Sequence, residues 1–433
     1  MQAPRTHRTS IGGAVALAAL MVAPAATLAQ EESPAPAPAQ VRVLHGAGDA
    51  PAVDVYANGD RILEEVPFGQ ISGYLSVPAG EYQVQVVPAG ATVEEGPVVI
   101  DAPLTFESGT MTTVAATGSL ASGIVPQVIT DEPAPTTDGT QVRVVHLSAD
   151  APAVDIAADG GDVVVAGLAY PDATDYLSLP ADEYDLEIRP AGTTDVAFDI
   201  DPLTLDAGTS YSAFAVGSLA DESFTVVPAV DAQLAAVRVL HGSADAPNVD
   251  VYANGSAVLT DVPFGAISDY LYVPGGEYRI QVVPTGATLE EGPVVIDAPL
   301  TFEGGTMTTV AATNVLAEIT PKVITDAPKP REGRAQVRVV HLSADAPEVD
   351  IAPDGSRQRD AIFEGLEFGE ASRYRTVDAG TYDLVVRAAG TRDRAFDIPE
   401  VDLAAGTSYS AIAIGQLGDE SFQVILVEDA SAE

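Results

Sequence analysis

The sequence predicts an all-β protein built from four tandem antiparallel β-sandwich domains of the immunoglobulin-like or transthyretin-like type. The first observation is a segment that occurs four times: VRVLHGAGDAPAVDVYANG from Val41, VRVVHLSADAPAVDIAADG from Val142, VRVLHGSADAPNVDVYANG from Val237 and VRVVHLSADAPEVDIAPDG from Val337. Each copy opens a unit of roughly 95 residues, about the size of one sandwich domain. The second observation is a series of short strand patterns between turn signals, with no helical period. Together they indicate an array of similar domains.

The strand patterns of the first unit follow one another in order. VRVLH alternates apolar and polar residues, as a half-buried strand does. Asn58-Gly59 follows VDVYA and is the strongest two-residue hairpin signal. Later segments are bounded by Pro, Gly or acidic turns, and they give seven or eight strands in all. The expected strand segments are Val41–His45, Val53–Ala57, a short strand before Pro67, Gly73–Pro78, Glu81–Pro88, Gly96–Phe106, Thr110–Thr117 and Ile124–Thr130.

The four units alternate between two types. Residues 41–117 and 237–313 align without a gap and are identical at 60 of 77 positions. The second and fourth units share other features, such as AGTSYSA at Ala207–Ala213 and Ala405–Ala411. The order A-B-A-B indicates that a two-unit pair was duplicated. The expected domains are A1 (41–130), B1 (142–229), A2 (237–326) and B2 (337–428).

The joins between units differ in composition. Both A-to-B joins, Asp131–Gln141 and Asp326–Gln336, are rich in proline and charge. Segments of this kind act as semi-rigid spacers. The B1-to-A2 join near Asp231–Ala236 is shorter and lacks proline.

The N-terminus has the three parts of a secretory signal peptide. MQAPRTHRTS is basic, IGGAVALAALMVAPAA is apolar, and TLAQ supplies small residues, so we expect residues 1–29 to be removed. Residues 30–40 then form a Pro/Ala spacer. The apolar stretch is shorter than the ~20 residues that a membrane span needs. We therefore expect a secreted, extracellular or loosely cell-wall-associated protein, with no transmembrane anchor in the mature chain.

Charge and composition exclude several kinds of partner and chemistry. The formal net charge is −43, and the signal peptide takes away Arg5 and Arg8 but no acid, so the mature chain carries −45. Such a field repels phosphate backbones, so we expect no nucleic acid partner, and it attracts divalent cations and basic proteins. The chain has no cysteine, which excludes disulfides and thiol catalysis.

Tyrosine recurs in register at two positions of the repeat. One set follows a turn of small residues, and its rings are expected to pack in the core with the hydroxyl on a backbone group, as in a tyrosine corner. A ligand-stacking role is the alternative. This set is Tyr82, Tyr184, Tyr278 and Tyr382, and the other set is Tyr74, Tyr176, Tyr270 and Tyr374.

Histidine and two aspartates also recur together. A His with two carboxylates is a donor set that a metal such as calcium or a transition ion could use. The structural alternative is that the first Asp caps the Asp-Ala-Pro turn and the second bonds backbone groups or the histidine. The structural interpretation is favoured, because four copies of one fold need a repeated turn. The candidate metal ligands are His45, Asp49, Asp54, His146, Asp150, Asp155, His241, Asp245, Asp250, His341, Asp345 and Asp350.

Motifs of known catalytic sites are missing from the sequence. It contains no GxSxG elbow, no HExxH and no phosphate-binding glycine loop. Acidic pairs are frequent, but an acidic surface produces them by chance, and a glycosidase pair needs geometry. We therefore expect no enzymatic activity and no catalytic or cofactor-binding residues.

The repeat resembles a known family. The pattern VRVxHxxxDAPxVDxxxxG, followed by PFGxISxYLxVPxGEYxxxVV, is similar to the prokaryotic family called domain of unknown function 4397, in four copies. The resemblance implies an extracellular β-domain and supplies no activity. The leading hypothesis is a secreted or envelope-associated non-catalytic array, acting as spacer, adhesion or protein-interaction modules whose partner is an extracellular protein or envelope component. The alternatives are a calcium or small-ligand binding protein and an extracellular hydrolase.

Overall fold

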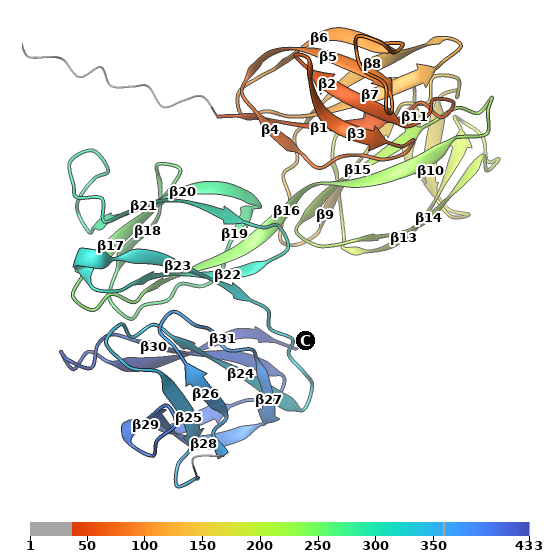
Figure 1. Ribbon diagram of the computed structural model, residues 1–433. Helices are drawn as coiled ribbons and strands as arrows, with labels where there is room; N and C mark the ends of the chain where they lie inside the picture. Colours follow the sequence, from red (N-terminus) through yellow and green to blue (C-terminus); the bar gives the residue numbers. More distant parts are fainter. Residues whose placement is uncertain (1–36, 358–359, 433) are drawn as a thin grey trace, which may run out of the picture.

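The structure is a computed structural model that describes residues 37–357 and 360–432, and it confirms the all-β class and the tandem sandwich modules (Figure 1). The predicted signal peptide and the first part of the spacer lie outside the described residues. In the part of the chain that is described, no helix has the length and apolar character needed to cross a membrane.

Units A1 and B1 occupy strands β1 to β16. The strands of A1 are β1 (Ala39–His45), β2 (Val53–Ala57), β3 (Asp60–Val66), β4 (Leu75–Val77), β5 (Gly80–Pro88), β6 (Ile100–Phe106), β7 (Met111–Ser119) and β8 (Gly123–Asp131). Those of B1 are β9 (Thr140–His146), β10 (Val154–Ala158), β11 (Val163–Leu168), β12 (Leu177–Leu179), β13 (Asp182–Pro190), β14 (Phe198–Leu205), β15 (Thr209–Val216) and the first part of β16 (Thr225–His241).

Units A2 and B2 repeat this order. A2 begins with the second part of β16 and continues with β17 (Val249–Ala253), β18 (Ser256–Val262), β19 (Leu271–Pro274), β20 (Gly276–Pro284), β21 (Ile296–Phe302), β22 (Met307–Thr313), the 3-10 turn η1 (Leu316–Glu318) and β23 (Thr320–Asp326). B2 comprises β24 (Arg334–His341), β25 (Val349–Pro353), β26 (Phe363–Leu366), β27 (Arg375–Asp378), β28 (Gly380–Ala388), β29 (Arg394–Leu403), β30 (Thr407–Ile414) and β31 (Gln423–Ser431).

Each unit is a sandwich of two four-stranded sheets. In A1 the order of one sheet is β4-β1-β7-β8, which we call the pairing sheet, and that of the other is β3-β2-β5-β6, which we call the outer sheet. The equivalent strands form the same two sheets in the other units. The first strand runs parallel to the seventh, as β1 does to β7, while every other pairing in the described residues is antiparallel. The parallel pair is the one departure from the antiparallel sandwich that the sequence predicts.

Alternation along the first strand gives the pairing sheet two buried faces. Val41 and Val43 point into the sandwich, where they join the apolar clusters of A1. Arg42 and Leu44 point to the opposite face, yet both are fully buried. A face that is buried on the outside of a sandwich must be covered by another domain.

The predicted hairpin and tyrosine positions are confirmed. Asn58 and Gly59 have φ of 51° and 88°, the left-handed values of a type I′ turn, and they connect β2 to β3. The hydroxyl of Tyr82 donates to the carbonyl of Pro78 at 2.8 Å, as a tyrosine corner requires. Its three counterparts make the same bond four residues back.

The chain enters and leaves each unit at the same end. In A1, Gln40 of β1 pairs with Met111 of β7, which pairs in turn with Asp131 at the end of β8. We call this end the base of a unit. The opposite end, where His45 pairs with Ala116, is the tip. The loops that follow β1, β3, β5 and β7 all lie at the tip.

An A unit and the B unit that follows it lie side by side through their pairing sheets, and we call the two together a pair. At the tips, the N–H of Gly217 in B1 donates to the carbonyl of Gly46 in A1 at 3.0 Å. One apolar cluster contains residues of both units, including Leu44, Val145 and Phe214. A2 and B2 share an equivalent cluster. The two units of a pair therefore point in the same direction, base beside base.

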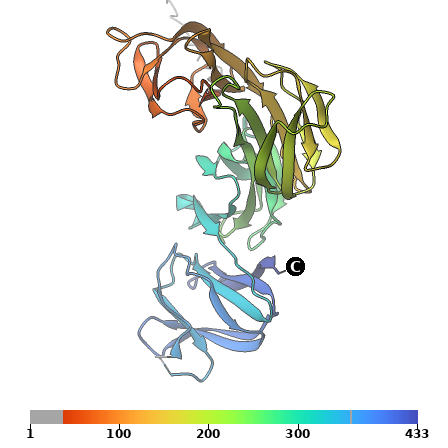
Figure 2. The same cartoon turned by 90° about the vertical axis from the view of Figure 1, so that its right-hand side faces the viewer.

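One long strand joins the two pairs. The first part of β16 pairs with β15 in B1, and its second part pairs with β19 and β22 in A2, so a seven-stranded sheet crosses the junction. Its residue Thr225 lies at the tip of B1, Gln233 lies at the base, and His241 lies at the tip of A2. The strand therefore runs from tip to tip through both bases, over about 55 Å at ~3.3 Å per residue. Figure 2 shows the two pairs on either side of it.

We expect Gly59→Val to destabilise A1 by about 1–2 kcal/mol, because a β-branched residue resists the positive φ of the turn. A side chain at Gly59 would meet no atom within 4 Å, so crowding would contribute nothing. Gly73→Val is the matched control, since Gly73 also faces open space but has no left-handed φ. Thermal denaturation of the full chain followed by circular dichroism measures both; equal effects of the two substitutions would contradict the turn assignment.

Candidate functional site

The four repeated histidines are buried at the tips, each against a carbonyl oxygen. Nε2 of His146, His241 and His341 lies 3.0–3.2 Å from the carbonyl of Pro152, Pro247 and Pro347, respectively. In A1 the ring bonds with Nδ1 instead, 3.1 Å from the carbonyl of Val66. Burial lowers the pKa of His45, His241 and His341, which keeps these rings neutral at neutral pH.

The first repeated aspartate holds the loop after the seventh strand. The carboxylate of Asp49 accepts the N–H of Leu120 at 2.9 and 3.0 Å, 71 residues further along the chain. The other units repeat this bond with Asp150 and Leu219, with Asp245 and Leu316, and with Asp345 and Leu417. The sequence predicts that this aspartate caps its own Asp-Ala-Pro turn. In the structure its carboxylate instead accepts hydrogen bonds from the loop after the seventh strand. This aspartate fixes the position of a leucine at every tip.

The second repeated aspartate anchors two backbone segments of the outer sheet. Asp54 accepts the N–H of Glu65 at 2.8 Å and of Gly90 at 3.2 Å, and Asp155 accepts those of Gly167 and Gly192. Asp250 and Asp350 make the same kind of bonds in A2 and B2. As expected from sequence, this aspartate bonds backbone groups, and the histidine is not its partner.

These bonds lower the pKa of the second aspartate. The N–H of Asp261 is the largest influence on Asp250, whose pKa is held below its ordinary value. For Asp54, burial alone would raise the pKa, but the N–H groups of Glu65 and Gly90 and the guanidinium of Arg61 outweigh burial and lower it. Both carboxylates are thus stabilised in their ionised form.

The repeated histidine and aspartates do not come together as a ligand set. Across residues 37–357 and 360–432, no three His, Asp or Glu side chains form a group that could hold a metal ion. In A1 the first aspartate bonds the loop after the seventh strand, the second bonds the N–H groups of Glu65 and Gly90, and the ring bonds the carbonyl of Val66, so each side chain is directed at a backbone group and not at the other two. Because a metal needs lone pairs that converge, this arrangement does not support the calcium hypothesis.

The tips expose leucine among acidic side chains. Leu120, Leu219 and Leu417 have 53, 49 and 39% of their surface exposed, although the aspartate below holds each backbone in place. The tip loops of pair A1–B1 contain nine acidic residues and no lysine or arginine. Those acids are Asp49, Glu94, Glu95, Asp150, Asp172, Asp175, Asp195, Asp221 and Glu222. This combination of fixed apolar side chains and uniform negative charge is a candidate contact surface.

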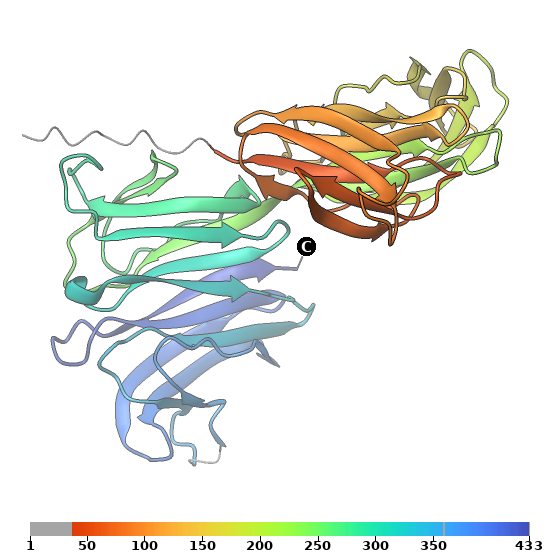
Figure 3. The ribbon, with the colours of Figure 1, turned by 45° about the horizontal axis from the view of Figure 1, so that its top comes forward.

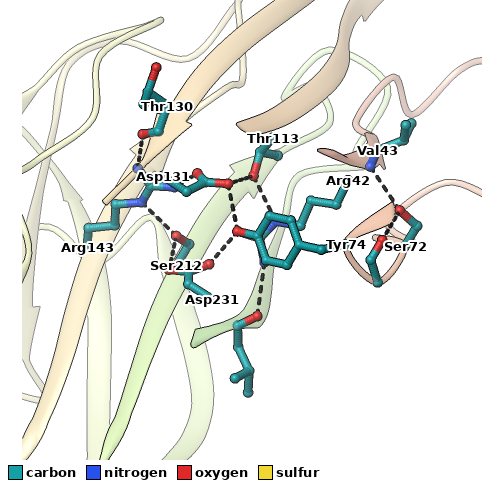
Figure 4. A network of polar contacts seen from close by, with 12 residues as sticks. Arg42, Val43, Ser72, Tyr74, Thr113, Thr130, Asp131, Arg143, Ser212 and Asp231 are labelled. Carbon is teal, nitrogen blue, oxygen red and sulfur yellow. Dashed lines mark hydrogen bonds and ion pairs between the residues drawn. The ribbon is translucent and has the colours of Figure 1, made fainter. Parts of the chain in front are cut away.

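A second cluster, which sequence reasoning did not identify, lies at the base between A1 and B1 (Figure 4). Arg42 of β1 forms an ion pair with Asp231 of β16, and Arg143 of β9 forms one with Asp131 of β8. Each ion pair crosses from one unit to the other. The four side chains are almost completely excluded from solvent, with 0–5% exposed.

Hydroxyl groups complete the hydrogen bonding of this buried network. Nε of Arg42 donates to Thr113, and the Thr113 hydroxyl donates to Asp131, both at 2.7 Å. Tyr74 donates to the same oxygen of Asp131, Oδ2, also at 2.7 Å. The B1 side is a mirror of this arrangement, with Ser212 in place of the threonine and Tyr176 in place of the tyrosine. Every buried charge therefore has several partners, which a charge out of water requires.

The neighbouring tyrosines remain protonated. Burial raises the pKa of Tyr74 and of Tyr176 far above the ordinary value, so both hydroxyls stay donors to a carboxylate. The guanidinium of Arg42 lies 4.6 Å from the centre of the Tyr74 ring, and that of Arg143 lies 5.0 Å from the Tyr176 ring. Stacking of this kind adds to the attraction for the buried cation.

The same network recurs at the base of A2 and B2. Arg238 binds Asp429 at 2.5 Å, and Arg338 forms the second ion pair with Asp326. A sequence signal for it exists: every unit has arginine as the second residue of VRV and an aspartate in its last strand. The partners are 189 residues apart in one case, so the pairing itself could not be read from spacing.

Comparison with known proteins identifies a family and gives no functional analogue. A family model described as domain of unknown function (DUF4397) matches residues 39–157, 140–236, 235–352 and 356–433. No curated protein matches the chain.

Two solved structures show a remote likeness to the chain. The Bacillus anthracis TIE protein is 12% identical with a TM-score of 0.16, and the alignment covers 83% of this chain and 65% of that one. A family CBM26 module of Eubacterium rectale Amy13K, solved with maltoheptaose, is 9% identical with a TM-score of 0.17, covering 46% and 98%. The chain thus spans less than two thirds of the TIE protein. At these TM-scores neither likeness supports a functional argument.

We expect Asp250→Asn to lower stability at neutral pH and to have little effect in acid. Because the folded pKa of Asp250 is depressed, its stabilisation is present above the unfolded value of about 3.9 and is lost as the pH falls through the folded pKa. Urea unfolding between pH 7 and pH 3 measures the difference from wild type. Asp269→Asn removes the same charge from an exposed site and is the control. A difference for Asp250→Asn that does not change with pH would refute this role.

Proposed function

Because the chain belongs to the family described as domain of unknown function DUF4397, in four tandem segments, we propose its function from its architecture alone. We propose a non-catalytic display protein of the cell exterior, which presents two pairs of tips to an extracellular protein or envelope component. The tandem modules and the predicted signal peptide support this role. The proposed protein acts as an adhesion or protein-interaction module and not as a spacer.

The path of β16 is the observation that carries the proposal. This strand joins the base of B1 to the base of A2, so the tips of the two pairs point away from each other (Figure 3). The described chain ends, Ala37 and Ala432, both lie beside bases, where Ala432 bonds the carbonyl of Gly406. Both ends therefore lie near the centre of the molecule and the tips lie far from them.

The tips have the chemistry of a protein-binding surface. The exposed leucines offer apolar surface that a partner can bury, at about 25 cal/mol per Å² of area removed from water. Their loops are fixed by the repeated aspartates, so little entropy is lost on binding. The surrounding negative charge selects a partner with a basic surface and speeds their encounter. A second pair of tips on the same chain, with Leu417 exposed in B2, also allows binding to two partner sites with increased avidity.

The experiment measures binding of the full mature chain to purified cell envelopes of the producing organism. The tip variant carries Leu120→Ser, Leu219→Ser and Leu417→Ser. The control variant carries Val163→Ser, Val164→Ser and Val258→Ser, which replace side chains of similar exposure, 44, 49 and 42%, in strands of the outer sheets away from the tips.

We expect the tip variant to lose at least tenfold in affinity while the control variant binds as wild type does. Wild-type binding should also weaken as salt is raised, because the partner surface is expected to be basic. Equal binding by both variants, or no binding by the wild type, would contradict the proposal.

A further inference from the structure

The two faces that meet within a pair differ in a systematic way. Four positions point into the apolar part of the interface: one on the first strand, one directly after that strand, and two on the seventh strand. In A1 they are Leu44, Gly46, Ala115 and Thr117, and the equivalent residues of B1 are Val145, Leu147, Phe214 and Val216. All eight residues are buried. At three of the four positions the B unit has the larger side chain.

The second pair repeats this distribution. A2 has Leu240, Gly242, Ala311 and Thr313, and B2 has Val340, Leu342, Ile412 and Ile414. The residues of B1 and B2 differ in detail, since Phe214 is replaced by Ile412 and Val216 by Ile414. At each position, the unit type that carries the larger side chain is nevertheless the same in both pairs. Such repetition indicates a requirement of the interface rather than of the individual sandwich.

The glycine shows the size requirement directly. A Cβ atom at Gly46 would lie 3.0 Å from the carbonyl oxygen of Ala116 in its own unit and 3.3 Å from Cγ1 of Val216 in the other unit, and one at Gly242 would lie 3.5 Å from Cγ2 of Ile414. The backbone bonding is the same in both unit types, because Gly46 bonds the carbonyl of Ala116 as Leu147 bonds that of Ala215. Leucine is thus compatible with this backbone, and a Cβ at the glycine would already be in contact with the facing side chain of the B unit, which leaves little room for a longer side chain.

We propose that these four positions are a pairing code, which makes the face of an A unit selective for a B unit. Two B-type faces would place leucine against valine or isoleucine and overpack the interface. Two A-type faces would set glycine, alanine and threonine against each other and leave a void. The polar network at the base gives no such discrimination, because arginine, aspartate and tyrosine occur on both sides. The alternation A-B-A-B is then a consequence of the code.

The test exchanges the code within the first pair of the full chain. The first variant gives A1 the B residues: Leu44→Val, Gly46→Leu, Ala115→Phe and Thr117→Val. The second variant gives B1 the A residues: Val145→Leu, Leu147→Gly, Phe214→Ala and Val216→Thr. The third variant carries all eight substitutions. The unchanged pair of A2 and B2 serves as an internal reference.

Hydrogen exchange at Gly217 is the direct measurement, because its N–H donates across the interface to Gly46. We expect hydrogen exchange of this amide to be at least tenfold faster in the first variant and in the second variant than in wild type. The third variant should regain most of the protection, since it only reverses the roles of the two faces. Amides of β2 and β5, inside the A1 sandwich, report whether the unit itself remains folded. The proposal would be overturned if the first and second variants left the protection of Gly217 unchanged, or if the third variant were no better protected than the less protected of those two.

Discussion

Arginine side chains buried between two domains are the constraint on which this structure depends. Arg42 and Arg143 each lie out of water, and each forms its shortest ion pair with a carboxylate of the neighbouring unit, while Arg42 also lies 3.8 Å from Asp131 of its own unit. Removing a guanidinium from water costs several kcal/mol, which is recovered only if the partner and every remaining hydrogen bond are in place. A replacement of such a pair by apolar residues can be neutral, but loss of one partner costs about 3–5 kcal/mol. The network therefore fixes how the units sit together more than it adds to stability.

The display geometry follows from where this network lies. Because the ion pairs and the apolar cluster hold the pairing sheets face to face, the two units of a pair point the same way. The first strand and the last strand of a unit both carry network residues at the base, so the chain must enter and leave there. β16 contributes Asp231 to one network and Arg238 to the other, seven residues apart on one strand. The two pairs are thus joined base to base, with their tips directed outward.

Local signals predicted the elements of the fold well, and they failed where partners are distant. Asn58-Gly59 gave the right turn because the backbone of a type I′ hairpin is determined by those two residues. Tyr82 gave the right bond because its acceptor is four residues away. The sequence predicts that Asp49 caps its own turn. Its partner in the structure, Leu120, is 71 residues away and is brought near only by the parallel pairing of β1 with β7. Nothing in a strand pattern indicates which face another domain will cover.

The measurement that tests the account most directly is a double-mutant cycle on Arg42 and Asp231 in the full chain. Urea unfolding of the full chain would be compared for Arg42→Met, Asp231→Asn and the double variant, with the exposed pair of Arg279 and Asp297 in A2 as control. The account expects each single variant to lose about 3–5 kcal/mol, with a coupling energy of at least ~2 kcal/mol, against about 0–1 kcal/mol for the control. Additive effects at Arg42 and Asp231, no larger than those of the exposed pair, would contradict it.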